Sequence, residues 1–80
     1  MNFTNKQDLI DFIKNQTNVE LKNIDGFCGE NPQILYAEIP KKHRNAVLSV
    51  CRKYGIETCE HLNGKYWFYL YENERRIDNG

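Results

Sequence analysis

Two β-prone runs, residues 56–62 and 65–72, are separated only by Asn63 and Gly64. An Asn-Gly pair at such a junction predicts a β-hairpin with a two-residue turn, because a type I′ turn needs positive φ at both central positions. A turn of this length also sets the cross-strand partners. These are Leu62 with Lys65, His61 with Tyr66, Cys59 with Phe68, and Glu57 with Leu70.

Hydrophobic periodicity, together with capping and turn-forming residues, divides the rest of the chain into predicted helices, strands and loops. Residues 5–16 have apolar side chains at helical spacing, with Thr4 as the expected N-cap and Thr17-Asn18 as the stop. Residues 19–25 alternate between apolar and polar, which predicts a half-buried edge strand. Residues 26–32 contain two glycines and a proline, which indicates a loop, and residues 33–39 predict an interior strand.

Pro40 opens the second predicted helix, because proline is tolerated in the first helical turn. Gly55 is expected to end this helix as its C′ residue. Its buried stripe is predicted to comprise Val47, Val50, Cys51 and Tyr54, with Ala46 beside it.

The element order α-β-β-α-β-β predicts an α+β domain. The simplest αββαββ architecture is a two-layer sandwich, with a four-stranded antiparallel sheet and both helices on one face. One option is a permuted ferredoxin-like arrangement, with strands 65–72 and 33–39 at the centre. A plain meander and differently paired hairpins are the alternatives. We expect a single domain over residues 1–80, ordered from about residue 3 to 73, with a flexible tail at 74–80.

Composition narrows the class of protein. Eleven basic and eleven acidic residues give a formal net charge of zero, whereas dedicated nucleic-acid binders are usually basic. Three cysteines without paired spacing do not form a disulfide framework, which is typical of a reducing cytoplasm. The polar N-terminus predicts no signal peptide, and no run is long enough for a membrane helix. Frequent Asn, Lys and Ile indicate an AT-rich genome, as in many phages and mobile elements.

The aromatic strand 65–72 carries the main candidate site. Alternation divides it into Tyr66, Phe68 and Leu70, which we assign to the core, and an opposite row of Trp67, Tyr69 and Tyr71. Tyr36 is expected beside this row. Such rings could anchor a protein partner or stack on nucleic-acid bases, and the structural alternative is that this row is itself the core.

A basic run opens the second helix and consists of Lys41, Lys42, His43 and Arg44. Cations at a helix N-terminus oppose the helix dipole, so this placement is not explained by helix stability. The run is a candidate site for phosphates or an acidic protein surface, although charge runs are most often solvated faces.

Catalytic and metal sites are not predicted. Cys28, Cys51, Cys59, His43 and His61 match no zinc-module spacing. Cys51 and Cys59 are expected to be small buried hydrophobes. Cys59 and His61 share a face of one strand, and Cys28 lies in a loop, but no base, orienting group or oxyanion hole is identifiable. We therefore expect no enzyme and no cofactor.

The leading hypothesis is a small protein-binding module, an inhibitor or adaptor, that uses Tyr36, Trp67, Tyr69 and Tyr71. The alternative is a nucleic-acid-binding domain that uses the basic run and the aromatic strand. A homodimer joined across the open sheet face or an edge strand is a third option.

Overall fold

The structure is a computed structural model that describes residues 2–24 and 30–71. The described part is an α+β domain of two α-helices and one three-stranded antiparallel sheet. The predictions for residues 25–29 and 72–80, which include Cys28 and the C-terminal tail, lie outside the described residues. Neither described helix has the length and apolar character needed to cross a membrane.

The first helix, α1 (Lys6–Thr17), begins one residue later than predicted. Its N-cap is Asn5 rather than Thr4, because the Asn5 side chain accepts a hydrogen bond from the Asp8 N–H at 2.9 Å. The predicted stop is confirmed, since Asn18 adopts the left-handed conformation at φ 65° and its N–H donates to the Lys14 carbonyl.

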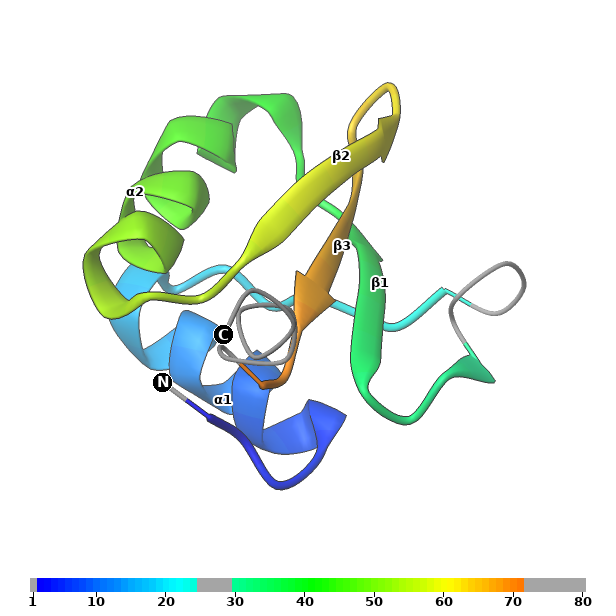
Figure 1. Ribbon diagram of the computed structural model, residues 1–80. Coiled ribbons are helices and arrows are strands. Elements are labelled where there is room, and N and C mark those ends of the chain that lie inside the picture. The colour runs from blue at the N-terminus through cyan, green and yellow to red at the C-terminus, as the bar shows by residue number, and fades with distance from the viewer. Residues whose placement is uncertain (1, 25–29, 72–80) are drawn as a thin grey trace, which may run out of the picture.

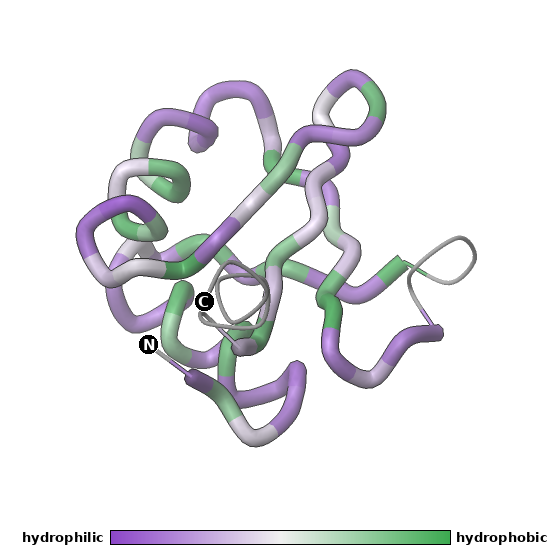
Figure 2. The backbone as a smooth tube through the Cα atoms, in the orientation of Figure 1, coloured by the Kyte–Doolittle hydropathy of each residue, from purple (hydrophilic) through white to green (hydrophobic). Residues whose placement is uncertain are grey.

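The second helix is preceded by a separate turn. Pro40 caps a 3-10 helix, η2 (Lys41–His43), and the α-helix proper is α2 (Arg44–Tyr54). Gly55 ends α2 at φ 73° as predicted. Figure 2 shows α2 as hydrophilic at both ends and hydrophobic in its middle. Val47 and Cys51 of the predicted stripe are buried, and Val50 and Tyr54 are partly buried against them, whereas Ala46 beside the stripe is exposed.

The sheet contains β1 (Ile34–Glu38), β2 (Thr58–Leu62) and β3 (Lys65–Tyr69) in the order β1-β3-β2. The aromatic strand β3 is therefore central, as expected, and Figure 1 shows it between the other two. Strand β1 is an edge of this sheet rather than an interior strand. The predicted fourth strand and the ferredoxin-like topology are not confirmed.

Residues 19–24 explain the missing strand. Val19 and Leu21 are buried, as their alternation predicts, but the segment makes no ladder with β1. One backbone hydrogen bond joins the two, from the Ile24 N–H to the Tyr36 carbonyl at 2.6 Å. The Tyr36 N–H donates instead to the Asn23 side-chain oxygen at 3.3 Å, so a side chain stands where a ladder would place a backbone carbonyl.

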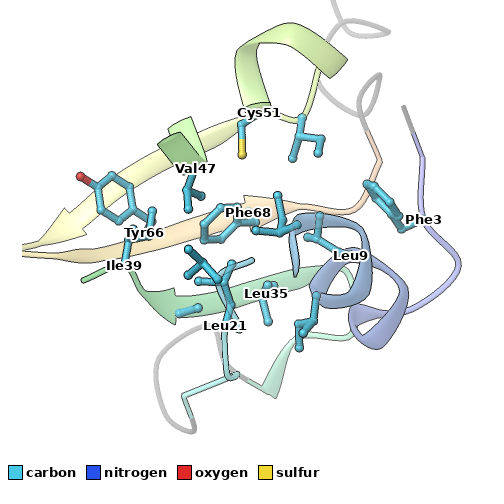
Figure 3. Packing of buried hydrophobic residues seen from close by; sticks show 14 of the residues in the cluster. Phe3, Leu9, Leu21, Leu35, Ile39, Val47, Cys51, Tyr66 and Phe68 are labelled. Carbon is cyan, nitrogen blue, oxygen red and sulfur yellow. The ribbon is translucent and has the colours of Figure 1, made fainter. Parts of the chain in front are cut away.

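Both helices pack on the same face of the sheet. This face carries Leu35 and Ala37 from β1, which pair in register with Phe68 and Tyr66 of β3. In Figure 3, Val47 and Cys51 point from α2 toward Phe68, and Leu9 approaches from α1. These residues form one buried hydrophobic cluster, which we call the core cluster. The helices also meet through Phe12 and Tyr54, whose rings lie edge to face at 5.0 Å.

The hairpin is confirmed, but its register is not the predicted one. Leu62 pairs with Lys65 as expected, whereas Tyr66 pairs with Glu60 instead of His61. His61 is thus an extra residue on β2, a β-bulge. The turn is not type I′, because Gly64 has φ 82° while Asn63 does not have positive φ. This one-residue shift changes the face of every earlier residue on β2.

Candidate functional site

The sheet face opposite the helices carries an aromatic cluster, which we call the outer-face cluster. It comprises Tyr36 from β1, His61 from β2 and Trp67 from β3, one ring from each strand. Alternation along β3 explains the position of Trp67, since its neighbours Tyr66 and Phe68 are buried among the core residues. The assignment of Tyr66, Phe68 and Leu70 to the core is confirmed by their burial, at 4%, 0% and 0% exposed.

Tyr36 lies directly beside Trp67 in the β1–β3 register. It is only 1% exposed, yet it is not part of the core cluster. The ring is therefore buried on the outer side of the sheet. The buried ring offers almost no surface for direct contact with another molecule, and it lies against the His61 ring with centroids 5.6 Å apart.

His61 completes the cluster because of the bulge. Its ring stacks on Trp67 with centroids 5.0 Å apart and an interplanar angle of 17°. Its Nδ1 is hydrogen-bonded to the Tyr36 hydroxyl at 2.8 Å. In neutral His61 protonated on Nε2, the hydroxyl is the donor. Stacking and hydrogen bonding together fix the ring in one orientation across the central strand.

The Trp67 indole has one unusual feature. Its Nε1 is buried and, within residues 2–24 and 30–71, has no hydrogen-bond partner. Buried indole N–H groups normally find an acceptor, and leaving one unpaired costs about 1–3 kcal/mol. The side chain as a whole is partly exposed, so Trp67 presents accessible ring surface while its Nε1 is buried.

The predicted burial of Cys59 and its predicted cross-strand partner are both wrong. The bulge places it opposite Trp67 instead of Phe68, and its side chain is exposed rather than buried. Cys51, by contrast, is buried on α2 as predicted. Burial raises the pKa of the Cys51 thiol to about 12, opposed in part by the nearby Arg52 charge.

The remaining predicted aromatic residues are divided. Tyr69 ends β3 with partial exposure, and its N–H donates to the Glu57 carbonyl at 2.9 Å. Tyr71 follows the end of β3 and packs against the core cluster. The alternation that relates Trp67 to Tyr69 therefore does not continue as a regular strand to Tyr71.

The basic run is split between two elements. Lys41, Lys42 and His43 form η2, and Arg44 is the first residue of α2. Lys41 and Arg44 line a pocket with the hairpin tip, together with Glu38 and Ile39. Lys42 and His43 are not part of this lining. Sequence reasoning singled out the run but could not show which two of its cations share a cavity.

Among the described residues, no group of three or more His, Cys, Asp or Glu side chains is placed to hold a metal ion. Comparison of the chain with models of protein families, with curated proteins and with solved structures found no match. Interpretation of the site therefore depends on its own geometry.

Proposed function

We propose that this chain is a small non-enzymatic protein-binding module that acts through the outer face of its sheet. The observation that carries the proposal is the His61 ring, which stacks on the partly exposed Trp67 and is hydrogen-bonded to the buried Tyr36. Trp and Tyr are the residues that most often dominate binding energy at protein interfaces.

Preorganisation is what makes the cluster suitable as an anchor. A large ring that is already held in place loses little side-chain entropy when a partner covers it. Tyr36 and His61 supply this restraint, and Trp67 supplies the accessible apolar area. Tyr69 extends the surface along the same face of β3. In this proposal Tyr71 is a marginal contributor, because it packs against the core cluster.

The chain's charge supports a protein partner over a nucleic acid. Its formal net charge is zero, so the chain as a whole carries no excess positive charge to attract a polyanion. An inhibitor or adaptor role in a host cytoplasm, a phage origin and a homodimer are finer proposals that rest on composition and size alone.

The test is capture of partners by immobilised chain from a host lysate treated with nuclease. Trp67→Ala and Tyr69→Ala are expected to abolish capture of the specific partner. Asn15→Ala is the control, because Asn15 is an exposed side chain on α1 and therefore lies on a helix and not on the outer face of the sheet. Each variant is first checked for a cooperative thermal transition.

Two results would contradict the proposal. One is undiminished capture by folded Trp67→Ala and Tyr69→Ala proteins. The other is capture that is lost on nuclease treatment and falls steeply with salt, which is the behaviour of a nucleic-acid binder.

A further inference from the structure

A pocket of about 210 Å³ lies where three parts of the chain meet. The end of β1 contributes Glu38, and Ile39 follows it. The basic turn contributes Lys41 and Arg44, and the hairpin tip contributes Asn63 and Gly64. The junction is held together by a hydrogen bond from the Ile39 N–H to the Gly64 carbonyl at 2.9 Å.

The 3-10 geometry explains why only two cations of the basic run line this pocket. A 3-10 helix has three residues per turn, so side chains at positions i and i+3 lie on the same side. Lys41 and Arg44 have this spacing, and the Arg44 N–H donates to the Lys41 carbonyl. The two residues between them are directed away from that side by the same geometry.

The charged side chains that line the pocket are available to a ligand. Within the described part of the chain, the side chains of Glu38, Lys41 and Arg44 form no ion pair or hydrogen bond. Two cations and one carboxylate line the pocket, so positive charge predominates in its lining, and the Glu60 carboxylate accepts a hydrogen bond from the Gly64 N–H beside it at 3.4 Å. The N-terminus of α2, which has no side-chain cap, adds partial positive charge of the same sign.

We infer that this pocket binds an acidic side chain of a protein, with its carboxylate between Lys41 and Arg44. The volume is below the roughly 300 Å³ at which small-molecule sites begin, so the pocket suits one side-chain-sized group. An arginine fork and an ammonium group are both strong donors to a carboxylate. Buried Ile39 provides an apolar wall for the methylene groups of the incoming side chain.

Glu38 argues against a nucleic-acid strand in this pocket. A strand brings a row of phosphates, and those next to a bound phosphate would approach the Glu38 carboxylate. A protein surface instead presents isolated acidic groups mixed with cations, and one such cation could pair with Glu38. The inference does not rest on the outer-face proposal, since it involves none of the same residues.

The experiment is a titration of the uniformly ¹⁵N-labelled full chain with an acetylated, amidated Gly-Gly-Glu-Gly-Gly peptide, which presents one isolated carboxylate. Gly64 is one of only five glycines, and its amide signal therefore reports on the pocket in an uncrowded region of the spectrum. We expect saturable shifts at Gly64 and Ile39. The Gly-Gly-Gln-Gly-Gly peptide, which has the same length and no charge, is expected to produce none.

Matched variants separate the pocket from diffuse surface charge. Arg44→Gln and, independently, Lys41→Gln should each weaken peptide binding about threefold or more, within the range measured for exposed ion pairs. Lys42→Gln removes the same charge from the neighbouring position and should leave affinity within about twofold of wild type. Glu38→Gln should strengthen binding, because it removes the repulsive carboxylate.

Equal weakening by Lys42→Gln and Arg44→Gln would overturn the inference, as would shifts that do not saturate. Tighter binding of a short oligothymidylate than of the glutamate peptide at the same amides would overturn it in favour of nucleic acid. Spectra of the variants that superimpose on wild type away from the pocket show that the fold is intact. Loss of capture in the lysate experiment on the outer face would not alter any of these outcomes.

Discussion

The Tyr36 hydroxyl and the His61 Nδ1 lie 2.8 Å apart and join the two outer strands of the sheet across the central one. Because β1 and β2 each pair only with β3, no backbone ladder connects them. The side-chain bond therefore couples parts of the sheet that are 25 residues apart in sequence. The His61 ring of this bond stacks on Trp67, the residue that β3 contributes to the same face.

This bond should contribute measurably to stability. Tyr36→Phe removes the hydroxyl and His61→Phe removes the nitrogen, while both retain a ring in place. In a double-mutant cycle we expect a coupling of about 0.5–1.5 kcal/mol in the free energy of unfolding. Chemical denaturation of the four proteins measures it, and strictly additive single effects would contradict it.

The register of the hairpin predicts which thiol reacts. A hairpin without the bulge would place Cys59 opposite the buried Phe68, whereas the bulge exposes it opposite Trp67. In a Cys28→Ser background, iodoacetamide at pH 8 should alkylate Cys59 in the folded chain. Cys51 should react only after denaturant is added, because its thiol is buried and its pKa is raised. Peptide mapping by mass spectrometry distinguishes the two, and early labelling of Cys51 would show the packing to be wrong.

The same bulge shows where sequence reasoning reached its limit. The hairpin and the buried row of β3 were predicted correctly, because turn residues and a two-residue period are local signals. The register departs from the prediction at His61, where β2 carries one extra residue, although Leu62 and Lys65 pair as predicted. This extra residue moved Cys59 to the opposite face and brought His61 onto Trp67.

Segment 19–24 illustrates a different limit. Its alternation correctly predicted the burial of Val19 and Leu21, but burial with period two does not require a ladder of backbone hydrogen bonds. The Asn23 side chain accepts the Tyr36 N–H, a choice that no periodicity reveals. The pocket between Glu38, Arg44 and Gly64 was likewise beyond sequence reasoning, because it joins segments that only the fold brings together.

The buried Cys51 thiol predicts a pH dependence of stability. Its pKa is about 12 in the folded chain against an ordinary value of 9.0. Between these values the unfolded chain releases the proton while the folded chain retains it. The contribution of the Cys51 thiol to the free energy of unfolding is therefore complete below pH 9. As pH rises from 9 toward 12, the free energy of unfolding falls by up to about 1.4 kcal/mol per pH unit.

Lysine and tyrosine groups also titrate in this range. The change in the free energy of unfolding with pH is therefore compared between wild type and Cys51→Ala. That variant should lose stability less steeply with pH than wild type, although its stability at neutral pH is lower because a buried side chain has been shortened. Cys59→Ala controls for the removal of a thiol as such. Parallel pH profiles for wild type and Cys51→Ala in denaturant unfolding would refute the assignment.

Gly64 provides a test of the turn itself. Its φ of 82° lies in the left-handed region, and a Cβ built on it would meet only Glu38 Oε2, at an ordinary 3.9 Å. Gly64→Ala should therefore cost about 1–2 kcal/mol through backbone strain alone, without a steric clash. Gly64→Asn should cost less, because Asn tolerates this conformation better than other side chains. Equilibrium denaturation of the three proteins measures both effects. Equal losses for the two variants would mean that contact with Glu38, and not backbone conformation, determines the preference for glycine at the hairpin tip.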